Sequence, residues 1–465
     1  MLGYGFAMAK LPTVAIIGRP NTGKSTLFNR LINERKSIEH DVAGTTRDLV
    51  SKRVDLGDMS FILVDTGGIG STEDKDFEKD VAGQSELAIE FADVIIFTVN
   101  SREEITNDDR KVVDIIRKKR KRHVPVIVAI TKTDDPHKLD EVILNYSEMN
   151  IGDEIIAVSA PHRHGIVELE SVIIKQLKKL NFGPVEKEDP ANRPPKIAII
   201  GKPNVGKSSI VNALMTDVQR ETAPLLVSPI AGTTRDSVDT EVTYHGKQYI
   251  LIDTAGLKKK SRSVDDIERF AAMRTITAVE EADVVILVLS AAEQPSQQDK
   301  RIASLAEESG KGLIILLNKI DTMKGEKREQ AVEFVEESLQ FVTKFAKIIP
   351  CSAVTREGLV KLFDLVAGVQ ESRTRRISTR DLRRWFEDVV HGQPLGEVAK
   401  TKHITQAKDV PPTFVLFVKN PKRVAVSQLR YLENRLRETF GFDGTPIRWI
   451  TKGGEEGEPE RKLKR

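Results

Sequence analysis

The sequence has few of the features that mark secreted and membrane proteins. A single cysteine, Cys351, excludes intramolecular disulfides and fits a reducing cytoplasm. No stretch of eighteen apolar residues occurs, so we expect no membrane span. The first ten residues lack the early positive charge and the apolar run of a signal peptide. Aromatic residues make up only 5%, and no basic amphipathic membrane helix stands out. We therefore expect a cytoplasmic protein without a membrane role.

What is present is the composition of a globular protein, with 39% hydrophobic and 30% charged residues. At about 100–200 residues per domain, a chain of 465 residues predicts three domains. The net charge of +3 is unevenly distributed. Residues 371–465 carry 21 Lys and Arg against 13 Asp and Glu, a balance of +8 that leaves −5 for the rest. This basic part is compatible with nucleic acid binding and equally with a solvated surface.

One loop motif occurs twice, as GRPNTGKS over residues 18–25 and as GKPNVGKS over residues 201–208. Each copy follows a short apolar run and leads into a helical pattern, which is the context of a phosphate-binding loop. The loop glycines let backbone N–H groups face phosphates, and Lys24 or Lys207 reaches the terminal phosphates. Ser25 and Ser208 are placed to give a hydroxyl to Mg²⁺. A chance glycine turn is the alternative, and the second copy makes it negligible.

Further motifs repeat in the same order, displaced by 183 to 193 positions, which indicates a duplication. Strands alternate with helices in both copies, so we predict an α/β fold with two P-loop nucleotide-binding domains, each a parallel sheet with helices on both faces. A small α+β domain follows, with a helix capped by Ser378 or Thr379 and another that stops at Gly441. The predicted boundaries are 11–180, an acidic Pro-rich linker at 181–195, 196–370, 371–450, and a polar, disordered tail at 451–465.

The base is chosen by the motif Asn318-Lys-Ile-Asp321 of the second copy. A carboxylate there accepts both hydrogens on guanine's Watson–Crick edge, an amide bridges base and loop, and the lysine stem lies over the ring. Adenine offers no matching donors, so we predict GTP and GDP as ligands and interpret the two repeats as P-loop GTPase domains. The first copy has Thr131-Lys-Thr-Asp134, in which a hydroxyl replaces one amide contact. We expect a loss of about 0.5–1.5 kcal/mol and weaker GTP binding at the first site.

In each copy a threonine, an aspartate and a glycine tie loop shape to the γ-phosphate. The threonine reaches Mg²⁺ only when that phosphate is present, the aspartate holds the metal through water, and the glycine offers a backbone N–H. Each domain is therefore a candidate switch. These residues are Thr46, Asp65 and Gly68 in the first copy and Thr234, Asp253 and Gly256 in the second.

The residue that follows the glycine is Ile69 in the first copy and Leu257 in the second, where many GTPases carry a glutamine that orients the attacking water. Neither side chain can orient water, so we expect slow intrinsic hydrolysis. The remaining predicted contacts to nucleotide are Gly18, Gly23, Thr26, Lys132, Ser159 and Ala160 in the first copy, and Gly201, Gly206, Ser209, Lys319, Ser352 and Ala353 in the second.

The two phosphate loops, the paired Gly-Thr-Thr-Arg-Asp motifs at residues 44–48 and 232–236, the acidic linker and the Pro411-Pro412 third domain together resemble the Der (EngA) family of tandem-G-domain GTPases. The resemblance implies a KH-like third domain and a factor that assembles the large ribosomal subunit, binding rRNA in a nucleotide-dependent way. It also implies that Asn21 and Asn204 hold a K⁺ ion near the phosphates. The alternative for these asparagines is a loop-stabilising role.

The only G-x-x-G sequence of the third domain, Gly441 to Gly444, falls between a helix and the last strand, so we interpret it as a cap and turn rather than an RNA clamp. Two other functions stay open at this point. The chain could be a GTP-gated switch for a protein or membrane-associated partner, or a scaffold whose first site is degenerate. We expect a monomer.

Overall fold

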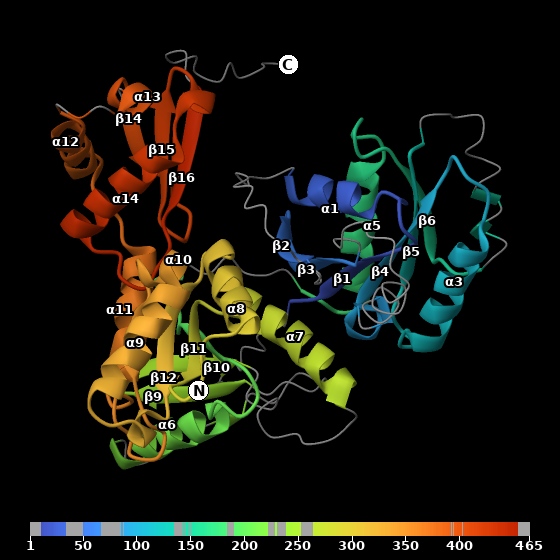
Figure 1. Cartoon of the computed structure of the whole chain (residues 1–465). Coiled ribbons are helices and arrows are strands. Elements are labelled where there is room, and N and C mark those ends of the chain that lie inside the picture. The colour runs from blue at the N-terminus through green and yellow to red at the C-terminus, as the bar shows by residue number, and fades with distance from the viewer. Residues whose placement is uncertain are drawn as a thin grey trace, which may run out of the picture. The chain divides into compact units, whose positions relative to one another are not determined.

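The computed structural model describes residues 11–33, 50–66, 85–86, 88–133, 143–144, 146–147, 150–183, 190–221, 228–229, 239–252, 264–391, 393, 395–401 and 403–453. The chain divides into two compact units (Figure 1). Unit 1 comprises Met1–Lys187 and Ser261–Glu280, and unit 2 comprises Glu188–Lys260 and Glu281–Arg465. Unit 1 contains one sheet, and unit 2 contains two.

The sheet of unit 1 has the order β2-β3-β1-β4-β5-β6. All neighbours are parallel except β2, which pairs antiparallel with β3 at one edge. Parallel strands place their carboxyl ends at one edge, where ligands bind in such folds. The strands are β1 (Thr13–Ile17), β2 (Val50–Leu56), β3 (Met59–Asp65), β4 (Val94–Asn100), β5 (Val126–Thr131) and β6 (Glu154–Val158).

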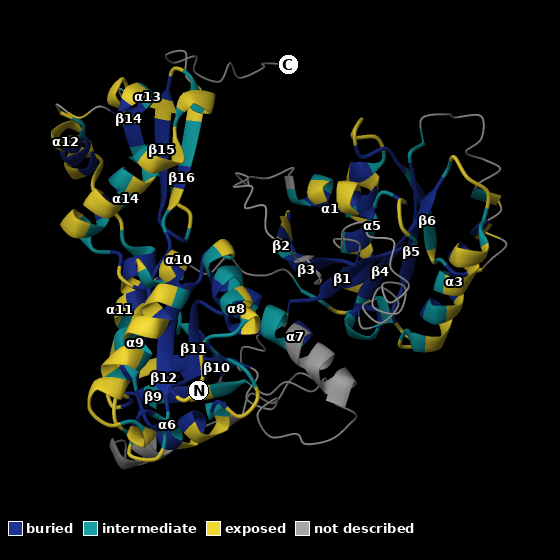
Figure 2. Ribbon diagram, in the orientation of Figure 1, coloured by how far each residue is buried: buried dark blue, intermediate teal, exposed yellow. Residues whose placement is uncertain are grey.

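The apolar run of β1 forms a strand that is buried on both faces. Side chains alternate across a strand, so Val14 and Ile16 join one core cluster while Ala15 and Ile17 join another. Helices α1 (Lys24–Asn33) and α5 (Ile166–Lys179) cover the first face, and α3 (Asn107–Lys119) covers the second. Figure 2 shows the buried strands between helices whose outer sides are exposed. The predicted α/β class with helices on both faces is confirmed.

The first sheet of unit 2 repeats this arrangement in the order β13-β12-β11-β7-β10-β9-β8. Its strands are β7 (Lys196–Ile200), β8 (Ser228–Pro229), β9 (Thr240–Tyr244), β10 (Lys247–Ile252), β11 (Val284–Ser290), β12 (Gly312–Asn318) and β13 (Lys347–Pro350). Its helices are α6 (Lys207–Glu221), α8 (Gln297–Glu308), η3 (Ile320–Thr322), α9 (Glu326–Ser338), α10 (Gln340–Thr343) and α11 (Leu362–Thr374). Helix α7 (Val264–Glu281) belongs, except for its last residue, to unit 1, where Met273 packs with Leu11, Ile62 and Val64.

The third sheet has the order β14-β15-β16, with β15 antiparallel to β14 and parallel to β16. Its hydrophobic cluster includes Leu382 and Trp385 of α12 and Leu432 and Leu436 of α14. The elements are α12 (Thr379–Val390), α13 (Gly396–Ala399), β14 (His403–Gln406), β15 (Thr413–Val418), η4 (Pro421–Arg423), α14 (Val426–Phe440) and β16 (Arg448–Gly453).

Two predicted helix ends of this domain are confirmed, and one boundary is wrong. The Ser378 hydroxyl accepts from the Asp381 N–H at the start of α12, and Gly441 ends α14. The tail was predicted to begin at Thr451, but β16 continues to Gly453 because residues 451–453 pair with residues 416–418 of β15. No helix in the described ranges is long and apolar enough to cross a membrane.

A buried ion cluster joins the end of the linker to the first sheet of unit 2. The carboxylate of Asp283 accepts from the guanidinium groups of Arg193 (2.6 Å) and Arg373 (3.2 Å) and from the backbone N–H of Lys196 (2.9 Å). Burial alone would raise the pKa of Asp283, but the charges of Arg373 and Arg193 outweigh burial and lower it. Asp283 therefore acts as a fixed negative centre that links the linker, β11 and α11.

Candidate functional site

Both phosphate loops lie at the carboxyl edge of their sheets, each between a buried strand and a helix. Residues 18–23 connect β1 to α1, and residues 201–206 connect β7 to α6. The Lys24 Nζ donates to the carbonyl oxygens of Gly18 (2.8 Å) and Arg19 (2.7 Å). Lys207 makes the equivalent contact with Gly201 (2.8 Å). The two loops therefore hold their lysines in the same way, over the concave side where a phosphate would lie.

Burial perturbs both lysines. Desolvation lowers the pKa of Lys24 to about 8, while the charge of Asp65 raises it and the charge of Arg19 lowers it. Desolvation also lowers the pKa of Lys207, against the charge of Asp299. An added negative group such as a phosphate would favour the protonated form of each lysine. The loops are thus electrostatically suited to an anion.

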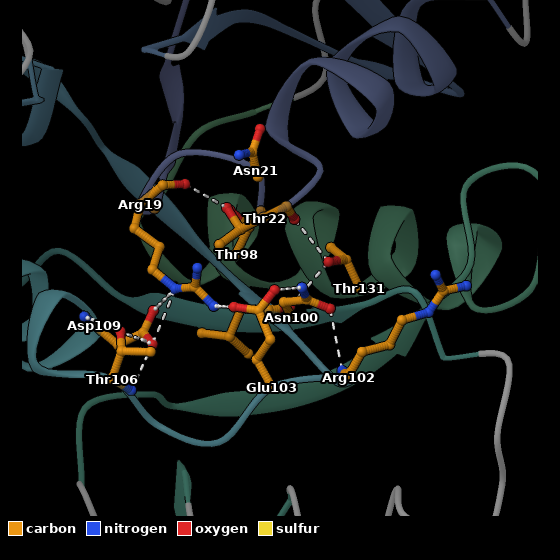
Figure 3. A network of polar contacts seen from close by, with 12 residues as sticks. Arg19, Asn21, Thr22, Thr98, Asn100, Arg102, Glu103, Thr106, Asp109 and Thr131 are labelled. Carbon is orange, nitrogen blue, oxygen red and sulfur yellow. Dashed lines mark hydrogen bonds and ion pairs between the residues drawn. The ribbon is translucent and has the colours of Figure 1, made fainter. Parts of the chain in front are cut away.

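The loop asparagines have the same unusual backbone conformation in both copies. Asn21 has φ 63° and Asn204 has φ 65°, in the left-handed region that asparagine tolerates better than most residues. Both side chains are exposed, and among the described residues neither amide makes a hydrogen bond. Figure 3 shows the Asn21 amide apart from the contacts drawn around it.

The lysines of the two base motifs, Lys132 and Lys319, also contact the phosphate loops. Lys132 and Lys319 follow β5 and β12 with φ 58° and 64°. The Nζ of Lys132 donates to the Asn21 carbonyl (2.8 Å), and the Nζ of Lys319 donates to the Asn204 carbonyl (2.9 Å). In the second copy Asp321 lies in η3, with an exposed side chain. A lysine stem stretched between the two loops gives a planar base a surface to lie on.

The remaining predicted residues that the structure describes line the same edge. Ser25 and Thr26 occupy the exposed first turn of α1, as Ser208 and Ser209 do in α6. Asp65 is buried at the end of β3. Ser159 and Ala160 follow β6, and Ser352 and Ala353 follow β13. The predicted residues Thr46, Gly68, Asp134, Thr234, Asp253 and Gly256 lie outside the described residues.

The sequence reasoning missed one part of the site, namely an ion pair behind each phosphate loop, which Figure 3 shows for the first loop. The Arg19 Nε donates to both carboxylate oxygens of Asp109 (3.0 and 3.1 Å), and its second nitrogen pairs with Glu103. Asp109 is fully buried and also accepts from the backbone N–H and the hydroxyl of Thr106 at the start of α3. The guanidinium of Arg19 lowers the pKa of Glu103.

The second copy repeats the central ion pair of this network with a lysine in place of the arginine. Lys202 pairs with Asp299 (2.9 Å), whose carboxylate accepts from the backbone N–H and the hydroxyl of Ser296 at the start of α8. The available signal was a capping box, Thr106-x-x-Asp109 and Ser296-x-x-Asp299, repeated at the spacing of the duplication. A carboxylate that caps a helix can accept further hydrogen bonds, and Arg19 and Lys202 donate them to Asp109 and Asp299.

A family model described as a 50S ribosome-binding GTPase matches residues 13–132 and again 196–319. A second, described as the C-terminal KH-domain-like part of EngA bacterial GTPase enzymes, matches residues 376–452. GTPase Der of Agathobacter rectalis is 40% identical over 96% of this chain and 99% of its own length. The chain belongs to the Der (EngA) GTPase family. GTPase Der of Alkaliphilus metalliredigens is 41% identical over 95% of this chain and 98% of its own length.

Membership of the Der family establishes a GTP-hydrolysing enzyme with tandem G domains and a KH-like third domain, and with a role in ribosome assembly. It also establishes guanine nucleotide and Mg²⁺ as ligands. A solved structure of Era from Aquifex aeolicus, bound to GDP and aluminium fluoride, is 21% identical over 56% of this chain and 94% of that chain, with a TM-score of 0.28. A similarity this low carries no argument about function.

Proposed function

We propose that the chain acts in assembly of the large ribosomal subunit and that both G domains bind guanine nucleotide. The observation that carries this proposal is the equivalence of the two phosphate loops. Lys24 and Lys132 contact the first loop with the same atoms and nearly the same distances as Lys207 and Lys319 contact the second. A site that had lost its ligand would not need to keep these contacts. The 50S-binding description of the matching family model supports the large subunit as the partner.

In the first copy the Ser25 hydroxyl at the start of α1 and the Asp65 carboxylate at the end of β3 fit a Mg²⁺ ion, because hydroxyl and carboxylate oxygens suit this hard cation. Ser208 has the same place at the start of α6. Mg²⁺ would neutralise developing charge on the phosphates. We propose that the exposed amides of Asn21 and Asn204 hold K⁺ beside it. Hydrolysis without a glutamine is slow, and the protein is a cytoplasmic monomer. The proposed metal ligands are Ser25, Thr46 and Asp65 in the first copy and Ser208, Thr234 and Asp253 in the second.

The test is co-sedimentation with purified large subunits, in a non-hydrolysable GTP analogue, in GDP and without nucleotide, at two salt concentrations. Salt-sensitive binding with the analogue alone is expected, since contacts to rRNA phosphates weaken as salt rises. The matched control is Asp321→Asn, which removes the carboxylate that recognises guanine in the second domain and should abolish the nucleotide dependence. If no nucleotide state binds, the ribosomal role is wrong and a protein partner becomes the better explanation.

A further inference from the structure

In the second G domain one amide ties together the three loops around the base. Asn318 ends β12, and its Nδ2 donates to the carbonyl of Val205 in the phosphate loop (2.8 Å). Its Oδ1 accepts from the backbone N–H of Ala353 in the loop after β13 (3.1 Å). The amide approaches so closely that a Cβ on Gly206 would lie 2.3 Å from Nδ2. Asn318 thus holds the phosphate loop and the base-side loop at once.

Thr131 occupies the same place at the end of β5, paired with Asn100 as Asn318 is paired with Ser290. Its hydroxyl lies 2.7 Å from the Thr22 carbonyl and 2.9 Å from the Val99 carbonyl. A hydroxyl has one hydrogen, so it donates to one of these two carbonyls at a time, and the contact with Thr22 replaces the bridge to the phosphate loop. In the part of the chain that the structure describes, Thr131 makes no hydrogen bond with Ala160. One of the two ties is therefore lost at this position.

The first phosphate loop makes a hydrogen bond between side-chain hydroxyls for which the second loop has no counterpart among the described residues. Thr22 and Thr98 are both fully buried, and their hydroxyl oxygens are 2.8 Å apart. The Thr98 hydroxyl also lies 3.2 Å from the Ile17 carbonyl, so the hydroxyls can form a chain from loop to strand. A buried hydroxyl is costly unless it is hydrogen-bonded, and this chain satisfies both. Valines, which have no hydroxyl, stand at the equivalent positions 205 and 288, and both are buried.

The base-side loop of the first domain is held from α1 instead. The Nε of Arg30 donates to the Ala160 carbonyl (2.6 Å), and a second nitrogen donates to the Pro161 carbonyl (3.2 Å). Arg30 lies in the last turn of α1. The equivalent position in α6 is Ala213, which is buried and has no side chain that could reach a loop. The two ties made by one asparagine in the second domain are thus divided among several side chains in the first.

We propose that Thr22, Thr98 and Arg30 are positioning residues of the first nucleotide site, which take over the two ties of the missing asparagine. The hydroxyl pair and Thr131 hold the phosphate loop, and Arg30 holds the base-side loop. The first site is therefore a guanine nucleotide site whose loops are held by different side chains, and not a degenerate site. This inference rests on the proposed binding of nucleotide by both domains.

The test measures the Kd and dissociation rate of fluorescent GDP in the full chain with Lys207→Ala, which weakens the second site. Adding Thr22→Val and Thr98→Val together removes two hydrogen bonds while keeping side-chain shape, so GDP should bind about tenfold more weakly. Arg30→Ala should weaken binding by several-fold. The serine variants at positions 22 and 98 keep the hydroxyls and should restore binding. Thr13→Val, at the opposite end of β1, is the matched control and should change nothing.

The deciding arm is Thr131→Asn, which recreates the amide of the second domain. Added to the valine pair or to Arg30→Ala, it should return the Kd to within about twofold of the parent, whereas side chains that only stabilise the fold would not be compensated this way. The inference is wrong if the valine pair binds GDP like the parent, or if Thr131→Asn compensates neither the valine pair nor Arg30→Ala. Either result would leave the proposed nucleotide binding by both domains untouched. A parent that binds no GDP at the first site would instead overturn both this inference and the proposed occupancy of two sites.

Discussion

The ion pair behind the first phosphate loop makes a quantitative prediction. Arg19→Ala removes a guanidinium from the fully buried carboxylate of Asp109, which then keeps only its cap contacts with Thr106. A hydrogen bond to a charged partner contributes about 1.5–3 kcal/mol, and the pair with the half-exposed Glu103 adds less than about 1 kcal/mol. We expect the phosphate loop and the start of α3 to lose about 2–3 kcal/mol of local stability.

Hydrogen exchange of amides in residues 18–25 and 106–110 measures this local free energy directly. A loss of 2–3 kcal/mol corresponds to exchange about 30- to 150-fold faster. Since the carbonyl of Arg19 also holds Lys24, GDP binding at the first site should weaken in parallel. Peptides from the two sheets of unit 2 provide the internal reference, because their exchange should not change.

Two further variants separate the buried contact from general disturbance of the loop. Arg19→Lys copies the Lys202–Asp299 pair of the second domain and should lose less than about 1 kcal/mol, as should Glu103→Gln. Exchange in Arg19→Ala at the wild-type rate would refute the reasoning, because the buried carboxylate would then not need its cation. A lysine variant as impaired as the alanine variant would show that the guanidinium geometry, rather than its charge, holds the loop.

Three other measurements test the charges of the site and of unit 2. The pKa of Lys24 is lowered to about 8, and bound phosphate would raise it, so GDP affinity at the first site should be full below about pH 8 and fall toward pH 10. Calorimetry in two buffers should show that GDP binding takes up protons. An affinity that does not change with pH would contradict this prediction. Asn21→Ala and Asn204→Ala together should abolish faster GTP hydrolysis in K⁺ than in Na⁺ buffer, and a persisting difference would exclude these amides as K⁺ ligands. Arg373→Met leaves the buried Asp283 with Arg193 as its remaining arginine partner, so the free energy of unfolding of unit 2 should fall by about 3 kcal/mol at neutral pH. The difference from wild type should shrink below about pH 4, where Asp283 is protonated in the unfolded chain. A urea midpoint equal to that of the wild type at pH 7 would refute this prediction.

The fold and the position of the site could be predicted because their signals are local and repeated. Apolar runs before each glycine loop form β1 and β7, and the order of motifs places every described candidate at the carboxyl edge of a sheet. The network of Arg19, Asp109 and Glu103 could not be predicted in the same way. These residues are up to 90 positions apart in the chain, and only the packing of α3 beside the loop brings them together.

The end of the third sheet shows a second limit of sequence patterns. The polar residues from Thr451 suggested a tail, yet residues 451–453 continue β16. Strand pairing uses backbone groups, so a polar segment extends a strand wherever a neighbour offers free partners, and β15 offers Leu416 to Val418. Composition alone does not carry this information.

The two G domains also show which features of the site are interchangeable. Backbone angles agree within a few degrees at the loop asparagines, with φ 63° and 65°, and at the base-motif lysines, with φ 58° and 64°. The side chains that fix those backbones differ, with hydroxyls and an arginine in one copy and an asparagine in the other. Phosphates and guanine are contacted largely by backbone N–H groups and a few charged atoms, so the ligand constrains the loop's path more strongly than it constrains the residues behind the loop. A change in a base-recognition motif is therefore weak evidence for a lost site until the contacts behind the loop have been traced.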